Sequence, residues 1–132
     1  MPHNVLVVGG DAQVRSAAVA VIEDAHVGCA AAVSAEDALA YLREHAPDVQ
    51  LIFTSFELPG RLDGVDVARV AALRWPWIKV LVTSDGARLR DLPSNVIFLP
   101  SDWDRADLQA QISWVGITAN ASESQQQRRT AA

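Results

Sequence analysis

Short apolar runs alternate with segments of helical periodicity along most of the chain. The runs are rich in Val, Ile and Leu, as in VLVV at residues 5–8, which is typical of strands buried on both faces of a parallel sheet. Between them, apolar residues such as Val14, Ala18 and Val21 recur at helical spacing. The expected strands are residues 4–8, 27–33, 49–54, 79–83 and 96–99. Five helices are expected. One begins after Asp11 and one at Ser34, and the other three cover residues 65–73, 86–92 and 102–115.

The order of these elements predicts one α/β domain. Five strands separated by helices favour a parallel sheet with helices packed on both faces. The last expected helix carries Trp103 and Trp114, eleven residues apart and therefore on nearly the same side. Residues 119–132 are polar and poor in bulky side chains, so we expect a domain over residues 1–118 and a disordered tail after it.

The composition of the chain excludes several classes of function. The chain has 132 residues, half of them apolar, and a formal net charge of −5 with scattered basic residues. A nucleic-acid-binding surface would need clustered Lys and Arg, and the apolar runs are too short to span a membrane. A single cysteine, Cys29, excludes an internal disulfide framework and a cysteine-based zinc site. These features predict a cytoplasmic protein that binds neither nucleic acid nor membranes.

The carboxyl ends of the expected strands are the place to look for a site, because ligands bind there in open α/β sheets. These ends are small and hydroxylic, and Asp11 is their only acidic residue. Gly9 and Gly10 follow the first strand, but the dinucleotide-binding fingerprint needs a third glycine that residues 12–14 do not supply. Asp11 is therefore interpreted as a helix cap.

Several sequence segments, taken in their order along the chain, resemble the receiver domains of response regulators in two-component signalling. They are VLVV, SAEDALAYLREHAPDVQLIFT, LPGRLDGVDVAR, KVLVTS and FLPSDWDRADLQAQI, and the resemblance covers roughly residues 3–117. It implies a flavodoxin-like (βα)5 three-layer sandwich whose five parallel strands have the order 2-1-3-4-5.

The resemblance also implies a phosphorylation site, and here the chain departs from the family. Receivers use an acidic pair to hold Mg²⁺, an aspartate to accept the phosphoryl group, a Ser or Thr to bind it, and a lysine to balance charge. Most of the corresponding positions in this chain hold small residues. The acidic pair corresponds to Gly9 and Gly10, with Asp11 next to it, and the acceptor aspartate corresponds to Ser55. The hydroxyl residue corresponds to Ser84 or, with a one-residue shift, to Thr83, and the lysine corresponds to Ser101.

This combination predicts a receiver-like domain without the usual phosphoryl transfer. We expect no bound Mg²⁺, no other cofactor and no enzymatic activity, because carboxylate ligands, acceptor and cation are all replaced. Such a stand-alone domain would act through a protein partner, such as a sensor kinase or another regulator, or as a homodimer. Phe98 and Trp103 are the candidate contact residues. Two alternatives stay open: a small anion or nucleotide bound at the strand ends, and modification of a hydroxyl such as Ser55.

Overall fold

A computed structural model describes residues 4–84 and 96–115 of the chain. The expected helix at residues 86–92, the tail at 119–132 and the side chain of Trp114 lie outside the described residues. No helix within the described ranges has the length and apolarity that a membrane crossing requires.

Five parallel strands form one sheet in the order β2-β1-β3-β4-β5, as the sequence predicted. The strands are β1 (Val5–Val8), β2 (Cys29–Ala32), β3 (Leu51–Ser55), β4 (Lys79–Ser84) and β5 (Val96–Pro100). β1 and β3 are almost wholly buried, because helices cover both faces of the sheet. β2 is shorter than the expected strand at residues 27–33. Most of its side chains are partly or fully exposed, as is common in a strand at the edge of a sheet.

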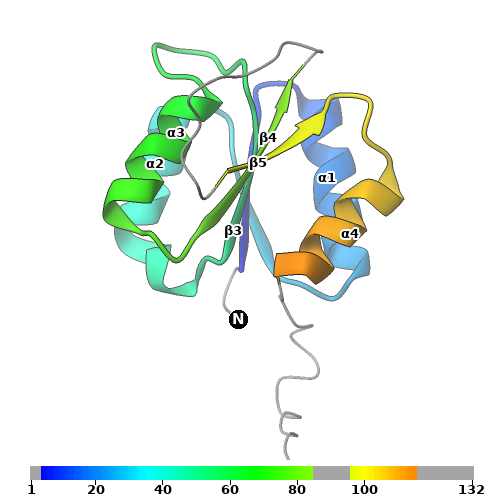
Figure 1. Ribbon diagram of the computed structural model, residues 1–132. Helices are drawn as coiled ribbons and strands as arrows, with labels where there is room; N and C mark the ends of the chain where they lie inside the picture. The colour runs from blue at the N-terminus through cyan, green and yellow to red at the C-terminus, as the bar shows by residue number, and fades with distance from the viewer. Residues whose placement is uncertain (1–3, 85–95, 116–132) are drawn as a thin grey trace, which may run out of the picture.

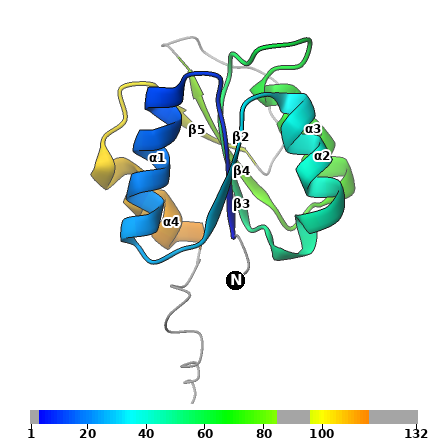
Figure 2. The ribbon, with the colours of Figure 1, turned by 180° about the vertical axis from the view of Figure 1, so that it is seen from behind.

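Helices form a layer on each side of the sheet, giving a three-layer sandwich (Figures 1 and 2). One layer holds α1 (Ala12–Asp24) and α4 (Arg105–Val115), and the other holds α2 (Ala35–His45) and α3 (Gly64–Arg74), with the short 3-10 helix η1 (Ala46–Asp48) after α2. Alternate strand residues point to opposite layers. Leu6, Ile52 and Val80 therefore pack with α2 and α3, while Val7, Phe53 and Leu81 pack with α1 and α4.

The helix starts are fixed by short acceptor side chains, and most agree with the sequence. Asp11 caps α1 and Ser34 caps α2, as expected. Asp63 caps α3 in a reciprocal capping box with Asp66. The start of the last helix was predicted wrongly: α4 begins at Arg105, not at residue 102, so Trp103 lies before the helix. A capping exchange between Asp104 and Asp107 satisfies the first backbone N–H groups and sets this later start.

Candidate functional site

The carboxyl ends of the strands meet at one edge of the sheet and bring most of the predicted site residues together. Register pairs Val8 with Thr54 and Ser55 with Thr83. A Cβ atom at Gly9 would lie 3.5 Å from the Ser55 hydroxyl, so these two positions are direct neighbours. The N–H of Ser101 donates to the Ser84 carbonyl at 3.0 Å, which continues the ladder beyond β5. We call this region, with Gly10 and Asp11, the strand-end site.

Register decides which hydroxyl faces Ser55. Ser55 and Thr83 are paired across β3 and β4, so their side chains share a face of the sheet. Two residues earlier, Phe53 and Leu81 both pack in the α1 and α4 layer. Ser84 points to the opposite layer by the same alternation. Of the two hydroxyls considered from sequence, Thr83 and not Ser84 therefore lies beside Ser55.

The loop after β3 lies closely against Gly10. A Cβ atom at Gly10 would come within 2.9 Å of Pro59 Cδ, closer than real Cβ contacts. Gly60 follows with φ of 94°, a left-handed conformation that suits glycine. The Glu36 carboxylate accepts the Arg61 N–H at 3.4 Å and ties this loop to the start of α2. The position where the resemblance expects a carboxylate is thus occupied by a proline ring from an anchored loop.

Asp11 is committed to the helix it caps. Its Oδ1 accepts the N–H groups of Gln13 at 2.8 Å and Val14 at 3.3 Å. Both bonds satisfy donors that would otherwise be unpaired at the start of α1. The side chain is exposed and acts locally, which agrees with the interpretation as a cap.

Arg15 brings a cation to the strand-end site that the sequence did not lead us to expect. Its Nη1 donates to the Gly9 carbonyl at 2.6 Å, and the side chain is half-buried. Helical side chains lean toward the helix N-terminus, so a residue four positions after the cap returns to the end of β1. That spacing is the signal by which Arg15 could have been found.

The site offers little to a divalent cation. Within residues 4–84 and 96–115, no group of three or more His, Cys, Asp or Glu side chains could hold a metal ion. Mg²⁺ prefers hard oxygen ligands in octahedral geometry, whereas the end of β1 presents two glycines and a capping carboxylate. The residues present do not fit a Mg²⁺ ion of the kind that receivers bind.

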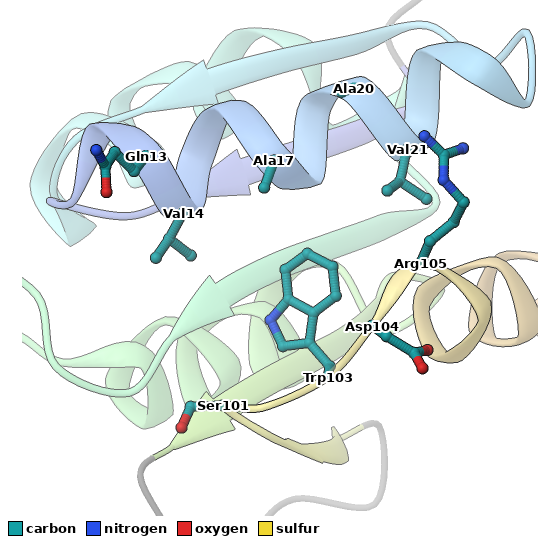
Figure 3. Close-up of a pocket in the computed structure, with 9 residues that line it drawn as sticks. All are labelled: Gln13, Val14, Ala17, Ala20, Val21, Ser101, Trp103, Asp104 and Arg105. Atoms are coloured by element: carbon teal, nitrogen blue, oxygen red, sulfur yellow. The ribbon is translucent and has the colours of Figure 1, made fainter.

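A groove of about 530 Å³ lies next to this site, between α1 and the segment that joins β5 to α4 (Figure 3). The Trp103 indole stands in the middle of the view, facing Val14 and Ala17 of α1. Its ring meets Phe53 edge-on, with centroids 5.4 Å apart, and so belongs partly to the core. An ion pair of 2.8 Å between Arg105 and Asp24 joins α4 to the far end of α1.

Phe98 and Trp103 do not form one surface. Phe98 is 40% exposed and pairs with Val82, whose side chain packs in the α2 and α3 layer. Trp103 lies in the α1 and α4 layer. The two candidate contact residues are therefore on opposite faces of the sheet, and each would need its own partner surface.

Comparison with known proteins gives a consistent picture of the fold. Neither a protein-family model nor a curated protein matches the chain. Solved structures do match. A CheY-like response regulator receiver domain protein from Methanospirillum hungatei JF-1 aligns with a TM-score of 0.76 and 17% identity, over 86% of this chain and 93% of that one. The receiver domain of NtrX from Brucella abortus gives 0.73 and 22% identity, over 84% and 96%.

A third similar structure is a complex. A chain of the CheX–CheY–BeF3–Mg²⁺ complex from Borrelia burgdorferi aligns with a TM-score of 0.76 and 17% identity, over 89% of this chain and 92% of that one. These alignments cover nearly the whole domain in both proteins. The chain therefore has the flavodoxin-like fold of CheY-like receiver domains, with the strand order that the sequence predicted.

Proposed function

We propose that the chain is an atypical receiver of two-component signalling that binds a signalling protein without being phosphorylated on aspartate. It has no catalytic turnover in this proposal. The observation that supports it is the strand-end site, where Gly9, Gly10 and Ser55 lie close together at the ends of β1 and β3 and bring no carboxylate. The resemblance to receivers expects carboxylates at these three positions.

The physical reason lies in the charge balance of phosphoryl transfer. Catalysis of this reaction consists mostly of positioning and of neutralising the charge on the phosphoryl oxygens. Gly9 and Gly10 supply no ligand for Mg²⁺, and Ser101 supplies no cation. Ser55 would need an adjacent base or metal to act as a nucleophile. Arg15 is bonded to a backbone carbonyl, which leaves it poorly placed to replace both the metal and a lysine.

The partner in this proposal is a signalling protein such as a sensor kinase or another regulator. A second copy of this chain, in a homodimer, is the alternative partner. A matching fold binds a protein in the CheX–CheY complex, which supports this class of partner. The groove beside Trp103 is the surface we assign to the contact, since its half-buried indole combines apolar area with a polar N–H group.

Amide NMR tests the loss of phosphoryl chemistry. The ¹⁵N-labelled chain is titrated with beryllofluoride and Mg²⁺, which together imitate an aspartyl phosphate. We expect no saturable shift at Gly9, Ser55 or Thr83, and the same spectrum with Mg²⁺ alone. Saturable shifts confined to these residues would show that the site still binds a phosphoryl group, and the proposal would be wrong.

A second candidate function is the binding of a small anion, and Arg15 is the observation that favours it. Its half-buried guanidinium places a positive charge at the end of β1, within the strand-end site. Thermal shift with millimolar phosphate and nucleotides tests this alternative, with Arg15→Gln as the control. A rise in Tm that disappears in the variant would favour a ligand-binding module.

A further inference from the structure

The sheet has an open edge at β2. This strand pairs only with β1, and in the part of the chain that the structure describes no strand lies on its outer side. In Figure 2 this edge faces the viewer, with β2 between α1 and α2. Successive residues of a strand turn their backbone N–H and C=O groups to opposite sides. Half of the hydrogen-bonding groups of β2 are therefore available to another strand.

Hydrogen bonds at both ends of the β1–β2 pair show which residues of β2 face outward. The carbonyl groups of Gly28 and Ala32 accept bonds from N–H groups of the β1 segment, at 3.2 and 3.0 Å. Even-numbered residues here thus turn their backbone groups to β1. By alternation, the N–H and C=O groups of Cys29 and Ala31 point away from the sheet. No backbone bond between described residues reaches them from the outer side.

The β2 edge lacks the features that commonly keep edge strands apart. Proteins protect such strands with charged side chains, proline or a bulge, among other means. β2 reads Cys-Ala-Ala-Ala, is as long as β1 and pairs with it in unbroken register. Ala31 is exposed, and Val33, just after the strand, is 45% exposed. The side chains at this edge are thus small and uncharged, and they leave the backbone accessible.

We infer that a second copy of the chain pairs with this edge, β2 against β2 in antiparallel orientation. A two-fold axis at Ala30 places Cys29 of each copy opposite Ala31 of the other. Residues opposed in this way exchange two hydrogen bonds, so four bonds satisfy all four outward groups of each β2. The edge is thus self-complementary, as the interface of a two-fold dimer must be. It is distinct from the strand-end site and the Trp103 groove, and the inference does not rest on the function proposed above.

The helices beside β2 leave room for the second copy. α1 and α2 each contact both β1 and β2, so they lie over the boundary between these two strands. Neighbouring strands of a sheet are about 4.8 Å apart. Adding the partner strand at this spacing puts the two copies of α1 about 10 Å apart, close to the usual distance between packed helices. The helix layers of the two copies would therefore meet in ordinary contact.

One side of α1 lies next to this edge. Arg15, Val19 and Glu23 recur every four residues and so lie on the same side of the helix. Burial and repulsion from the Glu23 carboxylate raise the pKa of the Cys29 thiol to about 11, so this side is close to β2. The residues of α1 that line the groove beside Trp103 lie on its other side.

The two-fold axis at Ala30 brings opposite charges together across the two copies of α1. From the level of Ala30 to the start of α1, β1 rises by about 13 Å. α1 covers this distance in about nine residues, so Val19 lies nearly level with Ala30. Val19 would then meet its own copy, and Arg15 would face Glu23 of the second copy. The Arg15 guanidinium has N–H groups besides the one that binds the Gly9 carbonyl.

These side chains favour a second copy over another extended segment. Any strand can bind an open edge through its backbone, but a copy of this chain also brings Glu23 to Arg15 and Val19 to Val19. On the other face of the sheet, the exposed charges of α2 are of both signs and favour no single occupant. They are Glu36, Asp37, Arg43 and Glu44.

Sedimentation equilibrium of the full chain, between about 1 and 500 µM, tests the dimer. We expect an equilibrium between monomer and dimer. Ala31→Lys places a charge on each edge and should weaken the dimer about tenfold or more, whereas Ala110→Lys, an exposed alanine of α4, should not. Glu23→Arg sets like charges against Arg15 and should also weaken it. Its matched control is Glu57→Arg, in an exposed loop position. The Tm of each variant is measured alongside.

Amide hydrogen exchange identifies the surface that associates. The outward N–H groups of Cys29 and Ala31 should exchange fast in dilute solution and become protected about tenfold or more as the dimer forms. Those of Ala30 and Ala32 face β1 and should be protected at every concentration. Ala31→Lys should remove the concentration dependence at Cys29.

Three results would overturn the inference. The first is a chain that stays monomeric over the whole concentration range. The second is a dimer that Ala31→Lys leaves intact, because its surface lies elsewhere. The third is protection of Cys29 and Ala31 at every dilution, because another part of the same chain would then pair with the edge. None of these results bears on the beryllofluoride titration, so the function proposed above is tested separately.

Discussion

Replacing Gly10 by alanine tests whether the loop after β3 has closed over the place of a lost carboxylate. Neither Gly9 nor Gly10 has a positive φ, so the backbone accepts a side chain at both positions. At Gly10 the new Cβ would lie 2.9 Å from Pro59 Cδ and 3.3 Å from Pro59 Cγ. The ring cannot rotate away, so the loop must move by about 0.5 Å to restore ordinary contact. At Gly9 the nearest atom is Ser55 Oγ at 3.5 Å, an ordinary distance.

The two alanine substitutions should therefore change the free energy of unfolding differently. Overpacking costs about 1–3 kcal/mol, and the loss of glycine freedom in the unfolded chain returns about 0.4–1 kcal/mol. We expect Gly10→Ala to be destabilised by about 1 kcal/mol and Gly9→Ala to be unchanged or stabilised by about 0.5 kcal/mol. Urea denaturation at pH 7 gives both values, and Tm should separate the variants by roughly 5 °C.

A double-mutant cycle assigns the cost to Pro59. Pro59→Ala removes the ring atoms that the new Cβ would meet, so Gly10→Ala should cost little in that background. The coupling free energy should be at least about 1 kcal/mol, as for residues in direct contact. Equal stabilities of Gly9→Ala and Gly10→Ala, or a coupling near zero, would refute the idea that the loop occupies this space.

Three further predictions concern local features of the described structure. Asp11→Ala should lower the free energy of unfolding by about 1 kcal/mol, and Asp11→Asn by much less, because either side chain can accept the N–H groups of α1. His26 has φ of 62° just after α1, so His26→Gly should stabilise the protein by about 0.5–1 kcal/mol in urea denaturation, and an unchanged midpoint would count against strain there. Burial, with repulsion from Glu23, raises the pKa of the Cys29 thiol from 9.0 to about 11, so the unfolded chain ionises first and stability should fall as pH rises from about 9 to 11. Cys29→Ala should show a shallower fall over the same range, and parallel curves would contradict the assignment.

The fold could be predicted from sequence because its signals are local and agree with one another. Buried strands read as apolar runs, and Asp11 and Ser34 mark helix starts through their own side chains. The start of the last helix could not be placed, because Asp102 and Asp104 are both good caps by type. Only the exchange between Asp104 and Asp107 decides between them. The sequence comparison favoured Ser84 over Thr83 for the hydroxyl position, whereas the register with β3 pairs Thr83 with Ser55. That register depends on how the strands align in space, which a single sequence does not show.

The sequence predicted which residue types form the strand-end site, but not which other residues surround them. The sequence identified the small residues at Gly9, Gly10 and Ser55, yet contacts between distant segments determine what surrounds them. Pro59 reaches Gly10 from another loop, and Arg15 returns from the second turn of α1. Trp103 was read as part of a helix face, whereas it inserts beside Phe53. Such contacts leave little trace in a single sequence, because they depend on where the loops fold back.

The contact between Gly10 and Pro59 bears on how the departures from the receiver pattern are related. A Cβ atom at Gly9 would lie at an ordinary contact distance, but one at Gly10 must displace a loop that is anchored by Glu36 and turns at Gly60. Substituting aspartate at Gly9 and Ser55 alone would thus leave Gly10, where the resemblance expects the second metal ligand, without a carboxylate and against the Pro59 ring. Adding aspartate at Gly10 would meet the proline ring, at a cost similar to that of the alanine variant. Under the function proposed above, a Mg²⁺ site would therefore require the loop to change together with the ligands, because packing as well as side-chain type opposes a carboxylate at Gly10.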